Sequence, residues 1–122
     1  MRQESNGEMC SICVGMIGAA GIVEIAGEVD IATVSMLAKA LDDAVTSGKG
    51  DLILDTQRLT YMDSAGIRTL LSTQRALAEK SRRLALVGCH GVFQKILKTS
   101  SLESRFALYS TVDEALSDFE AE

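Results

Sequence analysis

The 122-residue sequence contains no proline, a single histidine and only three cysteines. These low counts exclude particular structural features and types of site. Without proline, no slow folding phase from prolyl isomerisation is expected. No apolar run approaches the roughly 20 residues of a membrane-spanning helix, because Gly18 and Gly21 interrupt the most apolar region. The formal net charge of −5 argues against binding to the phosphate backbone of a nucleic acid, which requires a basic face.

The odd number of cysteines, without a secretion signal, indicates a reducing cytoplasm. The start of the chain is polar and carries acids, so residues 1–9 are expected to form a flexible N-terminal tail. Cys10 and Cys13 lie three apart on an expected strand, which places their side chains on opposite faces. No second cysteine–histidine pair completes a zinc site, and the adjacent Cys89 and His90 lack an orienting acid. We therefore expect no metal and no cofactor.

Apolar residues make up 47% of the chain, which is enough for the core of one globular domain, expected over residues 10–122. Periodicity predicts strands at 10–17, 22–26, 51–55, 83–87 and 106–109, and helices at 31–47, 64–80 and 92–99, with a last helix opening at the capping box of Thr111. This alternation predicts an α/β fold, a single layer of mostly parallel sheet flanked by about four helices. The short turn between the first two strands predicts an antiparallel hairpin at the N-terminal edge.

The stretch from Thr60 to Ile67 joins an apolar strand to a long helix. Asp63 is a suitable N-cap, because its carboxylate can accept from the unpaired backbone N–H groups of the first turn. Ser64 then lies near the positive end of the helix dipole, where added negative charge is tolerated. Ala65 and Gly66 are small, so a partner's backbone or a phosphate could approach closely. The hydroxyl of Ser64 is either a phosphorylation site or an ordinary first-turn serine.

A second polar segment, Gly27–Asp30, is expected to leave the sheet after the second strand. Asp30 either caps the next helix or contributes to a partner surface on the edge that also carries Ser64, because the carboxyl ends of parallel strands meet at one edge. Glu28 is expected to be simply solvated. Thr33 can satisfy its own backbone in the first helical turn.

These segments carry a family resemblance. The phosphoacceptor region of STAS-domain anti-sigma factor antagonists is similar to Asp63-Ser64-Ala65-Gly66-Ile67, preceded by Leu54-Asp55 and Tyr61-Met62. The other short motif of that family resembles Gly27-Glu28-Val29-Asp30, and the spacing between the two motifs matches. The resemblance extends over residues 10–120, nearly the whole chain.

The resemblance implies a cytoplasmic regulator that is not an enzyme. Unmodified, it would bind an anti-sigma factor serine kinase, whose phosphorylation of Ser64 would end the complex, and a serine phosphatase could reverse the modification. The residues implied for partner binding are Asp30, Thr33, Asp63, Ser64, Ala65 and Gly66. Ile31 and Ala32, beside Thr33, depart from the more polar version of this segment in the family.

Two other functions stay open. The chain could be a STAS scaffold module of a larger signalling or transport complex, without a phosphorylation switch. It could instead be a serine hydrolase with Ser64 as nucleophile and His90 as base, although it lacks the G-x-S-x-G elbow. A P-loop is absent, and a receiver domain phosphorylated on Asp55 would need an early acidic pair to hold magnesium.

Overall fold

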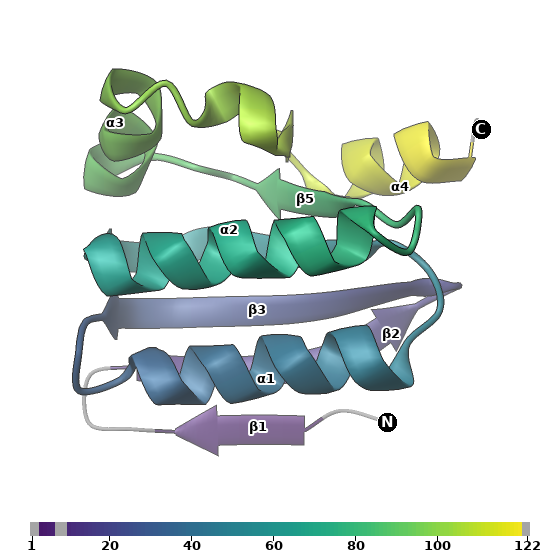
Figure 1. Ribbon diagram of the computed structural model, residues 1–122, viewed down its shortest axis with the longest axis horizontal. Coiled ribbons are helices and arrows are strands. Elements are labelled where there is room, and N and C mark those ends of the chain that lie inside the picture. The colour runs from purple at the N-terminus through teal and green to yellow at the C-terminus, as the bar shows by residue number, and fades with distance from the viewer. Residues whose placement is uncertain (1–2, 7–9, 121–122) are drawn as a thin grey trace.

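The computed structural model describes residues 3–6 and 10–120, arranged around a six-stranded sheet of order β1-β2-β3-β4-β5-β6 (Figure 1). The strands are β1 (Gln3–Asn6), β2 (Cys10–Ile17), β3 (Ala20–Val29), β4 (Leu52–Met62), β5 (Leu84–Val87) and β6 (Ala107–Tyr109). The helices are α1 (Val34–Ser47), α2 (Ser64–Ala78), α3 (Gly91–Thr99) and α4 (Val112–Glu120), and a short 3-10 helix, η1, spans Glu103–Arg105. Strands β1 to β3 pair antiparallel and β3 to β6 pair parallel, which confirms the predicted fold class and its antiparallel hairpin.

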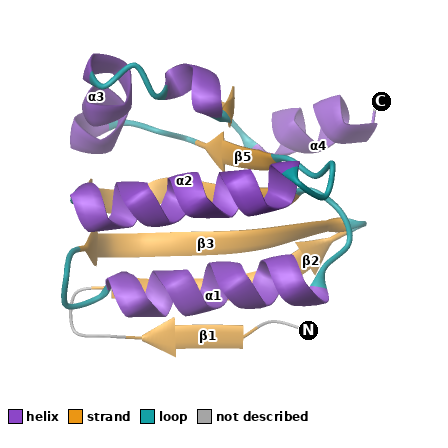
Figure 2. Cartoon of the chain, viewed as in Figure 1, coloured by secondary structure: helices purple, strands orange, loops and turns teal. Residues whose placement is uncertain are grey.

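The sheet separates two cores of unequal size. Helices α1 and α2 lie side by side across one face (Figure 2), where they cover the fully buried Val23, Leu54 and Leu86. On the opposite face, α4 packs over a smaller cluster that includes Ile53 and Val87. Successive residues of β4 therefore serve different cores, as the alternation of side chains along a strand requires.

The helices bury the stripes that their periodicity predicts. In α2 the buried positions follow at three and four residues, namely Ile67, Leu70, Thr73 and Leu77. Ala78, expected on this face, is exposed at the last residue of the helix. The capping box of α4 is present, since Thr111 Oγ1 accepts from the Glu114 N–H and Glu114 Oε1 accepts from the Thr111 N–H, both at 3.1 Å. Within the described residues, no helix combines the length and apolar character needed to cross a membrane.

Two strands are longer than predicted. Strand β3 continues to Val29 and β4 to Met62, so the expectation that residues 27–29 leave the sheet is wrong. The register between β3 and β4 shifts twice, after Glu24 and after Gly27, and each shift inserts one extra residue into β4. Such bulges interrupt the alternation of inward and outward side chains, which removed the pattern that would have revealed the second half of β4.

A further strand comes from the expected N-terminal tail. Gln3–Asn6 form β1 and pair antiparallel with Ser11–Val14 of β2. The edge of β2 offers unpaired backbone groups, and backbone pairing requires no side-chain pattern that a sequence could display. The remainder of the expected tail, residues 1–2 and 7–9, lies outside the described residues, so the domain boundary at residue 10 stays a prediction.

Candidate functional site at the ends of β3 and β4

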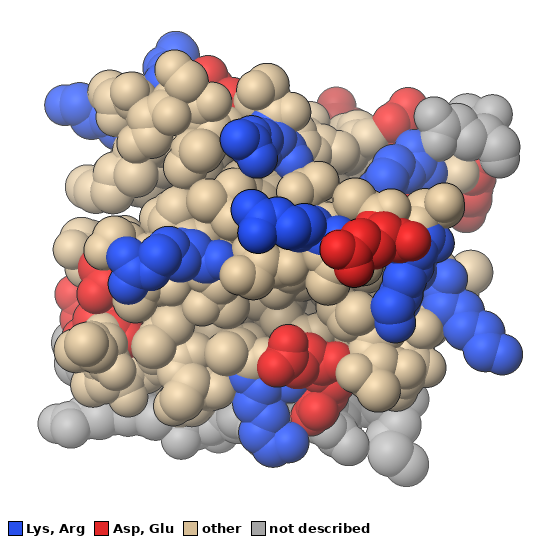
Figure 3. Space-filling view, viewed as in Figure 1, with Lys and Arg blue, Asp and Glu red and all other residues tan. Residues whose placement is uncertain are grey.

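The carboxyl ends of β3 and β4 are paired, and this pairing creates the edge where the predicted site residues meet. Val29 is in register with Met62, and the backbone N–H of Asp63 donates to the carbonyl of Val29 at 3.0 Å. Asp30 and Asp63 each follow the last residue of a strand, so they lie beside one another, as the sequence predicts. Acidic side chains gather at this edge between the N-terminal ends of α1 and α2, at the left of Figure 3.

Asp63 caps α2, as its sequence position predicts. Its Oδ1 accepts from the backbone N–H groups of Ala65 at 3.0 Å and Gly66 at 3.3 Å. Ser64 is the first residue of the helix and is exposed, and its hydroxyl has no hydrogen-bond partner in the part of the chain that the structure describes. The exposed Arg68 follows four residues later, on the same surface of the helix. The Ser64 hydroxyl is therefore accessible, with the acidic cap Asp63 before it in the chain and the basic side chain of Arg68 one helical turn after it.

Asp30 organises a tight turn where the sequence predicts the start of a helix. Its carbonyl accepts from the N–H groups of Thr33 at 3.0 Å and Val34 at 2.8 Å, and its Oδ1 accepts from the N–H of Ala32 at 2.9 Å. The hydrogen bonds to the Asp30 side chain hold the backbone of residues 30–33 in a turn instead of a helix. Helix α1 therefore begins only at Val34, with Thr33 as N-cap. Asp30 is half-buried, which leaves part of it on the surface.

The side chain of Thr33 is turned inward. Its Oγ1 donates to the carbonyl of Glu28 at 3.1 Å and accepts from the N–H of Asp30 at 3.0 Å. Only 7% of Thr33 is exposed, so its hydroxyl shapes the Asp30 turn and is not displayed to a partner. Glu28, expected to be simply solvated, is half-buried and lies opposite Tyr61 across the two strands.

Gly66 faces the interior, which differs from the prediction that it opens space for a partner. A Cβ atom at this position would lie 2.4 Å from Met62 Cγ and 3.0 Å from Val29 Cγ1. Glycine is therefore required by the close approach of α2 to the ends of β3 and β4. The neighbouring Ala65 is half-buried and lines a groove at the surface.

This groove, of about 580 Å³, runs between α1 and α2 and begins beside Ser64. Short side chains of both helices line it, among them Ala38 and Thr46 of α1 and Ala65, Thr69 and Ala76 of α2. Basic side chains gather over α2, whereas acidic and basic side chains lie together over α1 on this face of the molecule (Figure 3). Sequence reasoning missed the groove, because it exists only where the outer surfaces of two separate helices meet.

His90 does not reach Ser64. Its Nε2 lies 2.9 Å from the carbonyl oxygen of Gln57 in β4. Strand β4 runs on from there to Met62, which at about 3.3 Å per residue places Ser64 roughly 15 Å away. A nucleophile and its base must be within about 3 Å of one another, so these two residues do not form a catalytic pair.

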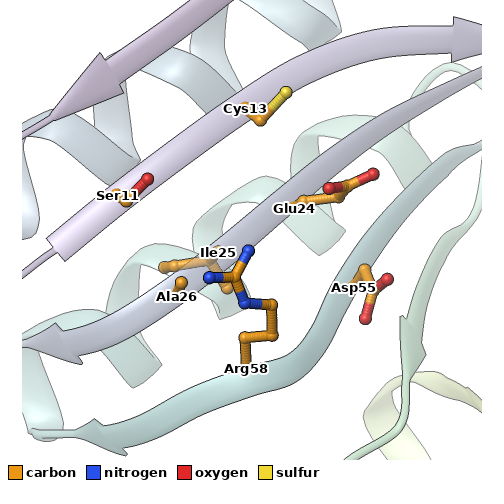
Figure 4. Close-up of a pocket in the computed structure, with 7 residues that line it drawn as sticks. All are labelled: Ser11, Cys13, Glu24, Ile25, Ala26, Asp55 and Arg58. Carbon is orange, nitrogen blue, oxygen red and sulfur yellow. The ribbon is translucent and has the colours of Figure 1, made fainter.

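The sheet face opposite α1 and α2 holds a small pocket of about 120 Å³ (Figure 4). Cys13, Glu24 and Asp55 are in register across β2, β3 and β4 and line it together with Arg58. Cys10 is buried in the core on the other face, so the two cysteines of β2 point to opposite faces, as predicted. Within the described residues, no three histidine, cysteine or acidic side chains are placed to hold a metal ion.

The environment of two cysteines keeps their thiols protonated. Burial raises the pKa of Cys10, and the negative charge of Asp30 raises it further. Burial also raises the pKa of Cys89, against the opposing effect of a hydrogen bond with Thr56, whose Oγ1 lies 3.6 Å from the sulfur. Since the thiolate is the reactive form, neither residue is an activated nucleophile at neutral pH.

A family model described as the STAS domain matches residues 14–115, which include the Asp30 turn, Asp63 and Ser64. The chain belongs to the STAS domain family. This STAS domain is 25% identical over 95 residues to the anti-sigma-F factor antagonist RsfB of Mycobacterium tuberculosis, with 78% of the chain and 77% of the relative covered.

Solved structures of anti-sigma factor antagonists share this STAS fold. The chain superposes on one from Mycobacterium paratuberculosis with a TM-score of 0.84 at 23% identity, covering 95% of this chain and 98% of that one. The Bacillus cell fate determinant SpoIIAA in its phosphorylated form gives a TM-score of 0.70 at 22% identity, covering 88% and 97% of the two chains. The family model confirms the STAS family predicted from the two short motifs, and the solved structures confirm its fold.

Proposed function

We propose that this STAS domain is an anti-sigma factor antagonist that is switched off by phosphorylation of Ser64. Unmodified, it binds an anti-sigma factor serine kinase through the edge formed by Asp30, Asp63, Ser64 and Ala65, and the sigma factor is released. The observation that carries the proposal is the exposed Ser64 hydroxyl at the first position of α2, beside the capping carboxylate of Asp63. Thr33 and Gly66 support this surface from beneath.

The modification is a phosphoryl transfer in which the kinase supplies ATP and the base. The Ser64 oxygen forms a bond to the γ-phosphorus, the bond from that phosphorus to the bridging oxygen of ADP breaks, and the hydroxyl proton passes to the base. Phosphoserine then carries about −1.5 to −2 charges at neutral pH. Hydrolysis of the phosphoserine by a serine phosphatase regenerates the binding form.

The comparisons support this proposal through the relatives' own functions. RsfB is named as an anti-sigma-F factor antagonist, and SpoIIAA exists in a phosphorylated form. In a scaffold module without a switch, Ser64 would be an ordinary first-turn serine, and no kinase would label it. A serine hydrolase would need a base near Ser64, where His90 is absent.

We further propose that the protein acts in the cytoplasm, since its three cysteines form no disulfide. We also propose that it does not bind nucleic acid, because its net charge is negative.

The test is phosphate incorporation by candidate anti-sigma factor kinases of the source organism. With γ-labelled ATP, one of them is expected to label the parent chain, while Ser64→Ala stays unlabelled and keeps its affinity for that kinase. Ser117→Ala, which removes an exposed hydroxyl from α4 on the other face of the sheet, is the matched control and should be labelled like the parent. Label that still enters Ser64→Ala would contradict the proposal.

Asp30→Asn separates the two roles of Asp30. Asparagine keeps the Oδ1 acceptor and caps about as well as aspartate, so the turn and the melting temperature should be preserved. If the negative charge of Asp30 meets a basic partner, the variant should bind the kinase several-fold more weakly, and the difference should shrink in high salt. Calorimetry at two salt concentrations measures both effects, and equal affinities for parent and variant would leave Asp30 with the capping role alone.

A further inference from the structure

The turn between β3 and α1 displays an isoleucine to solvent. Ile31 is 85% exposed, the highest value among the large hydrophobic side chains that the structure describes, of which the next, Met16, is 54% exposed. Single exposed hydrophobic residues are common, but turn corners favour Gly, Pro, Asn, Asp or Ser. Neither turn chemistry nor packing within the domain accounts for isoleucine at this position.

The backbone around Ile31 is held in place by hydrogen bonds on both sides. The residue occupies the first corner of a turn closed by the Thr33 N–H to the Asp30 carbonyl at 3.0 Å. Oδ1 of Asp30 accepts from the Ala32 N–H at 2.9 Å and the Thr33 N–H at 3.2 Å, and Thr33 is anchored to Glu28. A side chain presented on a pre-ordered turn loses less conformational entropy on binding than one on a mobile loop.

Ile31 also lies at the edge that carries Ser64. Asp30, its neighbour, adjoins Asp63 through the Val29–Met62 pairing and the hydrogen bond from the Asp63 N–H to the Val29 carbonyl. Asp30 directly precedes Ile31 in the chain and Asp63 adjoins Asp30, and acidic side chains gather at this edge of the molecule (left of Figure 3). The surface therefore combines an apolar centre with an acidic border, the arrangement in which buried anchors supply affinity and border charges supply specificity.

We propose that Ile31 is the apolar anchor of the partner-binding surface and that the partner offers an apolar socket bordered by basic side chains. This inference rests on the proposed function and names the chemistry of that partner. The socket receives Ile31, the basic border faces Asp30 and Asp63, and Ser64 lies at the same contact. An isoleucine in this segment also selects the partner, because a socket lined with polar groups would leave those groups unpaired against it.

The test measures binding to the kinase that labels Ser64, in the presence of ADP so that no phosphoryl transfer occurs. Ile31→Ala should raise Kd about 10- to 100-fold, which equals about 1.4 to 2.8 kcal/mol, while Ile31→Leu should stay within a few-fold of the parent. Met16→Ala, an exposed hydrophobic residue on β2 near the hairpin turn, is the matched control and should bind like the parent. Circular dichroism should give all three variants the parent's melting temperature.

The outcomes distinguish this inference from the function on which it rests. If the parent binds a kinase and Ile31→Ala binds equally well, the anchor is wrong and the proposed function stands. If the parent binds no anti-sigma factor, both fall. Sedimentation of the chain alone tests whether a second copy of this chain binds the Ile31 surface instead. If the parent dimerises and Ile31→Ala does not, Ile31 belongs to a dimer interface, and the proposed apolar socket on the kinase is wrong.

Discussion

Ser64→Asp is expected to bind the anti-sigma factor kinase about 100-fold more weakly than the parent, a change of about 2.8 kcal/mol. In a closed interface the carboxylate must lose water where a small hydroxyl fitted. The basic side chains of the partner already face Asp30 and Asp63, so the added charge stays unpaired, and an unpaired buried charge costs several kcal/mol. The groups already at this contact, Asp30 and Asp63, are acidic and oppose a further negative charge. Calorimetric titration with the purified kinase measures the effect.

The isolated domain is expected to tolerate the same substitution. Position 64 is exposed at the N-terminus of α2, where the helix dipole favours a negative charge by about 0.3–1 kcal/mol. Arg68, four residues on, offsets the repulsion from Asp63. The melting temperature of Ser64→Asp should therefore stay close to that of the parent, which separates loss of binding from loss of fold.

Ser117→Asp is the matched control for this experiment. It adds the same charge to an exposed position of α4, on the far face of the sheet, and should leave Kd unchanged. Binding of Ser64→Asp at the parent's affinity would rule out the switch. A loss of affinity shared by both variants would instead point to net charge as the cause.

Leu54→Ala should unfold at a much lower denaturant concentration than the parent. Leu54 is fully buried in β4, between β3 and β5, in the core that α1 and α2 cover. Truncation of such a leucine removes its transfer free energy and leaves a cavity, at a cost of about 2–5 kcal/mol. With a urea m-value of about 1–3 kcal/mol/M, the midpoint should fall by at least about 0.7 M.

Leu108→Ala is the comparison for this prediction. Leu108 lies on the edge strand β6 and is 40% exposed, so its truncation should cost much less. Fluorescence or circular dichroism in urea gives both midpoints. A midpoint for Leu54→Ala no lower than that of Leu108→Ala would mean that β4 is not the centre of the core.

Helix caps and the buried side of a helix could be predicted from the sequence. The cap formed by Asp63, the capping box of Thr111 and Glu114, and the buried stripe of α2 depend on residues within a few positions of one another. Their spacing alone specifies which donors and acceptors can meet. The alternation of strands and helices likewise predicted the fold class and the edge where Asp30 and Ser64 lie.

The length of β4 could not be predicted in this way. Two bulges in its pairing with β3 break the alternation of buried residues, so its second half resembles a loop in sequence. The pairing of Val29 with Met62, which brings Asp30 against Asp63, depends on that second half. For the same reason the separation of His90 from Ser64 was invisible until β4 was seen at its full length.

The sequence by itself determined which residues are chemically suited to the proposed switch: a serine at a helix N-terminus, its aspartate cap and a second acidic motif after a strand. Only the tertiary structure decided which of them are displayed. Thr33 and Gly66 turn inward because the Asp30 turn and the α2–sheet contact require them there, while Ile31 turns outward. Capping depends on a residue's sequence neighbours, so local patterns predict the chemistry of this site. Exposure depends on which distant segments pack against a residue, so only the tertiary structure determines which side chains of the site reach the surface.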